Sequence, residues 1–108
     1  MKKLLTLVIL FITFSITSQI QVVQFNANWN SANGVKWVNQ LTDCKVKEIC
    51  IVADKAAQSK HKIVVVPTIV IYNDGEEVTR FQANIMMTME ATVEDVQGKI
   101  DEIIMDAF

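Results

Sequence analysis

The side chains of this sequence that are best suited to covalent chemistry are two thiols, Cys44 and Cys50. A thiolate is the nucleophile of disulfide exchange, and two neighbouring thiols can form a disulfide. If the chain between them were extended, they would lie about 20 Å apart, at roughly 3.3 Å per residue. A disulfide requires Cα atoms about 4.4–6.8 Å apart. The two cysteines can therefore pair only if Cys44 lies in a loop that folds back.

Metal binding is the second chemistry that these side chains could offer. Cys44, Cys50, Asp54 and His61 are candidate ligands, but their spacing does not match the patterns of zinc sites. His61 is instead expected near the end of a short helix, where cationic character is mildly favoured. We predict no metal and no other cofactor.

A polar turn, within the stretch FNANWNSANGVKW, joins a strand to a helix. The apolar run over residues 20–26 predicts the strand. In the segment that follows, apolar residues recur in steps of three: Val35, Val38 and Leu41. Asn30 is suited to cap this predicted helix. We expect Trp37 in the core and Trp29 exposed in the turn, where a partner can reach it.

The middle of the chain predicts a strand and a short helix. Residues 46–53 end in a continuously apolar run, which is typical of a buried parallel strand. Asp54 then precedes the segment KAAQSKH, which we expect to be a helix capped by the Asp54 carboxylate. With the first strand and helix, these elements form a parallel crossover unit.

The second half of the chain predicts a hairpin. Pro67 cannot donate to a sheet, so it marks the entry to a strand over residues 68–72. Asn73-Asp74-Gly75 is a hairpin turn signal. The returning strand is predicted over residues 76–82.

A final helix closes the predicted domain. Residues 92–95 resemble a capping box. The helix carries a buried stripe at alternating steps of three and four: Val93, Val96, Ile100, Ile103 and Ala107. Three methionines precede it: Met86, Met87 and Met89. We favour core filling by a short helical lead-in for them, with an adaptable binding lip as the alternative.

The order β-α-β-α-β-β-α predicts an α/β domain, a mixed four-stranded sheet with helices on both faces. Three segments resemble the thioredoxin-like superfamily. VVQFNANWNSAN resembles the strand and turn that end in the family's Trp-Cys-x-x-Cys motif, VVVPT its cis proline before threonine, and IVIYNDGEEV its hairpin. The resemblance covers residues 20–105. It implies a minimal thioredoxin fold, without the N-terminal strand and helix of bacterial thioredoxins.

The departures from the family fall on its redox residues. Asn30 and Asn33 stand at the two cysteine positions, so the motif reads Asn-Ser-Ala-Asn. Gln24 stands where thioredoxins carry a buried aspartate, Cys50 where they carry a lysine, and Gln82 where a glycine admits partners. An asparagine amide is not a nucleophile for disulfide exchange. We therefore predict no catalytic residue at positions 30 and 33.

The resemblance also implies a peptide-binding groove. In the family, the backbone before the cis proline pairs with an extended substrate peptide by strand addition. Here that residue is Val66, and we expect the Val66–Pro67 bond to be cis and to lie beside Asn30. The candidate peptide-binding residues are Trp29, Val66 and Pro67.

The N-terminus has the layout of a secretory signal peptide. In residues 1–18, two lysines precede an apolar run, and small hydroxyl residues follow it. The run is shorter than the roughly 18–20 residues that cross a bilayer. We expect a signal over residues 1–18, a domain over residues 19–108, and export to the periplasm or the outside. After cleavage no stable membrane span is expected. An uncleaved anchor is the alternative.

Charge excludes one class of partner. Without Lys2 and Lys3, the basic residues fall from 10 to 8 against 12 acidic ones, and the formal net charge falls from −2 to −4. Such a domain has no electrostatic basis for binding nucleic acid.

The sequence favours a non-catalytic binding or scaffold module for an extended peptide or protein. The alternative is a thiol-disulfide oxidoreductase that acts through Cys44 or Cys50. A third interpretation is a decayed redox protein without a present partner.

Overall fold

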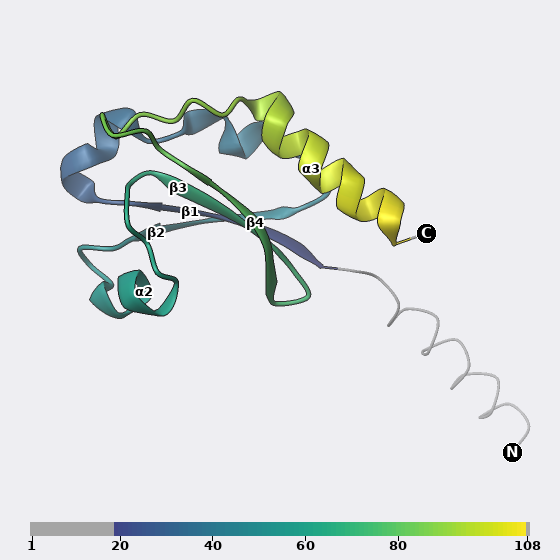
Figure 1. Cartoon of the computed structure of the whole chain (residues 1–108), viewed down its shortest axis with the longest axis horizontal. Helices are drawn as coiled ribbons and strands as arrows, with labels where there is room; N and C mark the ends of the chain where they lie inside the picture. Colours follow the sequence, from purple (N-terminus) through teal and green to yellow (C-terminus); the bar gives the residue numbers. More distant parts are fainter. Residues whose placement is uncertain (1–18, 108) are drawn as a thin grey trace, which may run out of the picture.

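The computed structural model of the protein describes residues 19–107 and contains a mixed four-stranded sheet (Figure 1). The strands lie in the order β2-β1-β3-β4. Their bounds are Ile20–Asn26 for β1, Lys45–Cys50 for β2, Thr68–Asn73 for β3 and Glu76–Gln82 for β4. β1 and β2 pair in parallel, and the other two neighbouring pairs are antiparallel.

Helical segments cover both faces of the sheet, which confirms the predicted α/β architecture (Figure 1). Two 3₁₀ segments, η1 (Asn28–Asn33) and η2 (Lys36–Gln40), lie on one face with α3 (Val93–Asp106). The short helix α2 (Lys55–Lys60) lies on the other face. Because side chains alternate along a strand, β1 contributes Val22 to one core and Phe25 to the other.

The predicted first helix over residues 30–41 is wrong. The chain forms η1 and η2 instead, with Gly34 and Val35 in extended conformation between them. The physical reason is a buried side chain. The Val35 N–H donates to Gln24 Oε1 at 2.7 Å, and the Val35 carbonyl accepts from Gln24 Nε2 at 3.0 Å. The backbone groups of Val35 are therefore not used in a continuous α-helical ladder.

The prediction of a buried strand over residues 46–53 is wrong in its burial and its end. β2 ends at Cys50 and is one of the two edge strands of the sheet, and all of its residues are exposed or partly exposed. Ile51, Val52 and Ala53 form a turn in which Ile51 is buried and Val52 is exposed. An edge strand has only one strand neighbour, which leaves its side chains less covered than those of β1 and β3.

Local signals in the rest of the chain predicted its elements well. The Asp54 carboxylate accepts from the Ala57 N–H at 3.2 Å and caps α2, as expected. Asp74 and Gly75 both have positive φ, at 53° and 87°, which the primed hairpin turns require. The returning strand β4 spans the predicted residues.

The capping box of α3 is confirmed. The Asp95 N–H donates to Thr92 Oγ1, and the Thr92 N–H donates to Asp95 Oδ2. Three residues at the centre of the predicted stripe are buried: Val96, Ile100 and Ile103. Ala107 is exposed and lies beyond the end of the helix.

The proposed signal over residues 1–18 lies outside the described residues. Within residues 19–107, no helix has the length and apolar character that a membrane crossing requires.

The packing of α3 predicts that the stability of the domain depends strongly on Ile100. This side chain is fully buried between α3 and the sheet. We expect Ile100→Ala to lower the free energy of unfolding by about 2–5 kcal/mol, measured by urea denaturation. Met105→Ala on the same helix removes a side chain that is 75% exposed, and we expect it to change stability by less than about 0.5 kcal/mol. Equal effects of the two substitutions would contradict the placement of α3.

Candidate functional site

Asn30 lies where three segments of the chain meet. Its Nδ2 donates to the Val66 carbonyl at 3.3 Å and reaches the Met87 carbonyl at 3.5 Å. It also donates to Asn26 Oδ1 at 3.2 Å, at the end of β1. The Asn30 side chain therefore links η1 to the segment before β3 and to the connection after β4.

The expected helix-capping role of Asn30 is wrong. η1 begins two residues earlier, after Ala27, and has no side-chain cap. Asn30 is buried inside η1, and its Oδ1 accepts from Asn33 Nδ2 at 2.9 Å. The side chains of Asn30 and Asn33 are thus amides that bond to each other within η1.

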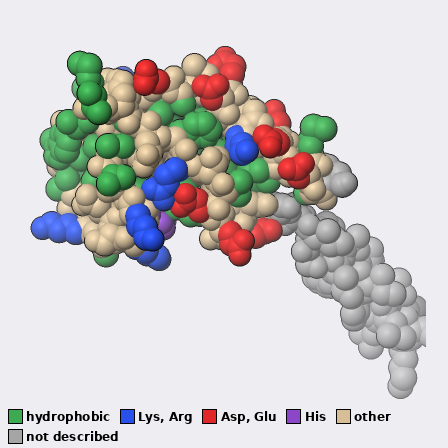
Figure 2. Space-filling model, in the orientation of Figure 1, with side chains coloured by type: hydrophobic (Ala, Val, Ile, Leu, Met, Phe, Trp, Pro, Cys, Tyr) green, Lys and Arg blue, Asp and Glu red, His purple; other side chains and the backbone are tan. Residues whose placement is uncertain are grey.

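An exposed apolar surface lies beside Asn30. Trp29 is 64% exposed, as expected from its place in the turn. Together with residues before β3 and after β4 it lines a groove of about 270 Å³; the lining includes Ile63, Val64, Val65, Val66, Ile85 and Met87. Val64 and Ile85 are 79% and 96% exposed. Figure 2 shows apolar side chains gathered at the end of the molecule that holds η1.

Asn84 orders the loop on one side of this groove. Its Oδ1 accepts hydrogen bonds from the Met86 N–H at 3.0 Å and the Thr88 N–H at 3.1 Å. Met87 adopts a positive φ of 61° in the same loop. The predicted helical lead-in is therefore wrong: Met86 is exposed and Met87 lines the groove, whereas Met89 packs against the core as expected.

The other two predicted peptide-binding residues lie at this site, but with reduced access. The Val66–Pro67 peptide bond is cis, and the Pro67 side chain is fully buried. The Val66 side chain is buried too, and its carbonyl is already bonded to Asn30. Of the three, Trp29 is the side chain that is open to a partner. Gln82 lies exposed at the end of β4, opposite Thr68.

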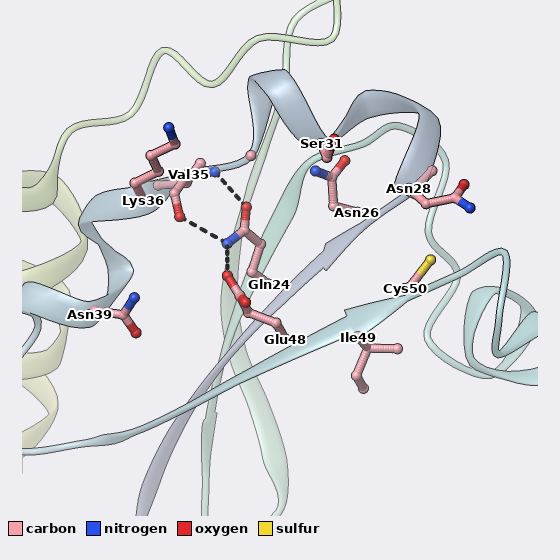
Figure 3. A pocket seen from close by; sticks show the side chains of 12 residues that line it. Gln24, Asn26, Asn28, Ser31, Val35, Lys36, Asn39, Glu48, Ile49 and Cys50 are labelled. Atoms are coloured by element: carbon pink, nitrogen blue, oxygen red, sulfur yellow. Dashed lines mark hydrogen bonds between the residues drawn. The ribbon is translucent and has the colours of Figure 1, made fainter.

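An open cleft of about 600 Å³ lies on the other side of η1, between η1–η2 and the strands β1 and β2 (Figure 3). Gln24 lies at the base of the cleft and is only 3% exposed. Besides its two bonds to Val35, Gln24 Nε2 donates to Glu48 Oε1 at 3.0 Å. The sequence pointed to Gln24 as a redox departure but not to the cleft, because the cleft depends on the gap between η1 and η2.

The two cysteines are both free, and they differ in character. Burial, and then the nearby Asp43 carboxylate, raise the pKa of the Cys44 thiol. The pKa of Cys50 is lowered, chiefly by the backbone N–H of Ala53 and then by those of Val52 and Asn28. Cys50 is partly exposed at the wall of the cleft.

His61 has a structural role at the end of α2. It is the residue that follows the last helical position, as predicted, and its Nδ1 lies 2.9 Å from the Tyr72 hydroxyl. Its ring packs against Phe25 with a centroid distance of 5.0 Å. Across residues 19–107, no three potential ligand side chains come together in a way that could hold a metal ion.

Comparison with known proteins finds likeness in structure. No family model matches the sequence. No curated protein matches it either. Among solved structures, an N21Q mutant thioredoxin from Halobacterium salinarum NRC-1 superposes with a TM-score of 0.61 at 21% identity, covering 78% of this chain and 74% of that one. Thioredoxin 1 from Thermosipho africanus TCF52B gives a TM-score of 0.61 at 14% identity, covering 81% and 97%.

A third neighbour comes from a complex of ferredoxin:thioredoxin reductase with thioredoxin f2, with a TM-score of 0.61 at 20% identity over 86% of this chain and 84% of that one. Together with the element order, these likenesses show that the chain has a thioredoxin-like fold.

The buried amide network predicts that Asn30 stabilises the fold. Asn30→Ala leaves the Val66 carbonyl and the Asn33 amide without their partner. We expect a loss of about 1–3 kcal/mol in the free energy of unfolding, measured by urea denaturation. Asn39→Ala is the matched control, because Asn39 is exposed and makes no side-chain hydrogen bond to the described part of the chain. The stabilising role of Asn30 is contradicted if both variants are as stable as the wild type.

Proposed function

We propose that this protein is an exported, non-catalytic binding module that holds an extended peptide or a protein segment in the Trp29 groove. The proposal is carried by one observation: the exposed apolar groove that Trp29 lines lies beside Asn30, whose buried amide bonds to Asn33 and to the carbonyl of Val66 in the groove wall. Export to the periplasm or the outside rests on the composition of residues 1–18.

The chemistry at positions 30 and 33 argues against turnover. Disulfide exchange needs a thiolate to attack and a second thiol to resolve the mixed disulfide. The Asn30 amide is instead buried and bonded to four groups of its surroundings: Asn26, Asn33, and the carbonyls of Val66 and Met87. These contacts suit a structural link and leave no group at this position that can attack a disulfide.

The apolar surface around Trp29 argues for binding. Large apolar side chains that are exposed together on a small domain mark interaction sites more often than isolated ones do. Here Trp29, Val64 and Ile85 are exposed around one groove, and Asn84 holds the loop that carries Ile85. Aromatic side chains such as Trp29 are also enriched among the residues that dominate binding energy.

The backbone before β3 offers a means of recognition. Among the hydrogen bonds between described residues, none uses the N–H groups of Val64, Val65 or Val66. An extended peptide can accept hydrogen bonds from such groups while its apolar side chains enter the groove. The Val66 carbonyl is bonded to Asn30, so this segment supplies donors more readily than acceptors.

A thiol-disulfide oxidoreductase acting through Cys44 or Cys50 is the alternative function. The lowered pKa of Cys50 favours it, whereas the raised pKa of Cys44 does not. The two cysteines lie near opposite ends of β2, about 20 Å apart by the rise of a strand. Neither can resolve a mixed disulfide formed by the other, so a complete dithiol cycle within one chain is not supported.

Peptide binding is tested with a phage-displayed library of random peptides. Clones selected on the wild-type protein are measured against Trp29→Ala and against Met105→Ala, an exposed position on α3. We expect Trp29→Ala to weaken binding at least about tenfold, as for the loss of a dominant aromatic contact. Met105→Ala should stay within about twofold of wild type. If the selected clones do not distinguish the two variants, the groove is not the binding site.

Catalysis is tested in a protein-disulfide reduction assay with dithiothreitol as the reductant. We expect the wild type to show the uncatalysed rate. The double variant with Asn30→Cys and Asn33→Cys is the positive control, because the side-chain ends at these positions lie 2.9 Å apart and two thiols there can interact. Wild-type turnover that disappears in Cys50→Ser would instead establish the oxidoreductase.

A further inference from the structure

We propose that the cleft between η1–η2 and the strands β1 and β2 is a binding site for a small zwitterionic disulfide of peptide-like chemistry, and that Cys50 on its wall forms a mixed disulfide with this ligand. The site is separate from the Trp29 groove, with which it shares no lining residue.

The cleft has the size of a small-molecule site. Its volume of about 600 Å³ falls within the range of about 300–1,000 Å³ that is typical of ligand pockets. Its shape follows from the interaction of Gln24 with Val35, because this interaction holds the chain extended between η1 and η2.

The lining suits a ligand with both charges and amides. The Lys36 side chain lines the cleft from η2, and the Glu48 side chain lines it from β2. These two charges can pair with a carboxylate and an ammonium group of one ligand. The side chains of Asn28, Ser31 and Asn39 also line the cleft, and they make no hydrogen bond with any of residues 19–107. They remain available for the peptide groups of a bound molecule.

Cys50 supplies the covalent contact. Its sulfur lies on the same side of β2 as the Glu48 side chain, whereas the intervening Ile49 side chain points away (Figure 3). The backbone N–H groups of Ala53, Val52 and Asn28 favour the thiolate over the thiol, so the nucleophile is present at neutral pH in a larger share than for an ordinary cysteine. The edge strand β2 thus forms one wall of the cleft and also carries the thiolate.

The reaction is a single thiol-disulfide exchange. The Cys50 thiolate attacks one sulfur of the ligand disulfide, a new S–S bond forms, and the original S–S bond breaks. The other half of the ligand leaves as a thiolate, which takes a proton from solvent. The ligand disulfide is the oxidant, and no further reagent is needed. Because Cys44 lies near the opposite end of β2, the adduct is not resolved within the chain and accumulates.

The experiment uses oxidised glutathione as a charged probe and bis(2-hydroxyethyl) disulfide as a neutral one. The purified protein is incubated with each at pH 7, and intact mass reports the rate of adduct formation. We expect one adduct per chain with glutathione, located at Cys50 by peptide mapping. Cys50→Ser should abolish it, and Cys44→Ser should leave it unchanged. Modification of both cysteines at equal rates would overturn the proposal.

Two further variants separate recognition by the cleft from the reactivity of an exposed thiol. Glu48→Gln keeps an oxygen that can accept from Gln24 and removes the charge, and Lys36→Gln removes the opposite charge. We expect each to slow the reaction with oxidised glutathione about two- to fivefold, the size of an exposed charge contact, and to leave the rate with the neutral disulfide unchanged. Added salt should reduce the same difference. If both variants react with the two probes as the wild type does, Cys50 is an accessible thiol and the cleft is not a binding site.

Discussion

A buried glutamine amide determines how the segment after β1 can fold. Gln24 uses its oxygen and its nitrogen on the backbone of Val35, and the same nitrogen reaches Glu48 on the edge strand. If this side chain were lost, the buried N–H and C=O of Val35 would be left without partners, at a cost of about 1–3 kcal/mol for each group. One side chain therefore fixes β1, the break between η1 and η2, and β2 relative to one another.

The asparagines around η1 make a second link, which depends on the first. With η1 held as a short separate turn, Asn26 and Asn30 exchange hydrogen bonds: each side chain bonds to a group of the other. Asn30 then extends the network to Val66 and Met87. The amide of Asn30 thus holds three segments of the site together. A thiol there would be a weaker donor and acceptor, and it would not supply the same set of bonds.

The features that the sequence predicted well are those set by neighbouring residues. The Asp54 cap and the Thr92–Asp95 box depend on side chains within three residues of the backbone groups that they satisfy. The Asp74-Gly75 turn depends on the positive φ of its own two residues. The features that it missed depend on distant partners. Gln24 and Val35 are 11 residues apart, so no helix propensity over residues 30–41 could reveal the break. The exposure of β2 follows from its place in the strand order, which the apolar run at its end did not indicate.

The same argument explains why the candidate site could be predicted only in part. Trp29 was placed correctly because the turn after β1 is a local feature. The lowered pKa of Cys50 could not be predicted from its neighbours alone. Its thiolate is stabilised by the N–H groups of a turn beyond the strand and by that of Asn28, which is 22 positions earlier in the chain. Asn28 lines the cleft and Trp29 lines the groove, so consecutive residues of η1 contribute to the two surfaces. The Asn26–Asn30 bonds that fix this turn hold both residues in place. The two sides of η1 therefore present different chemistry: apolar contact on one side, and charge, amides and a thiol on the other.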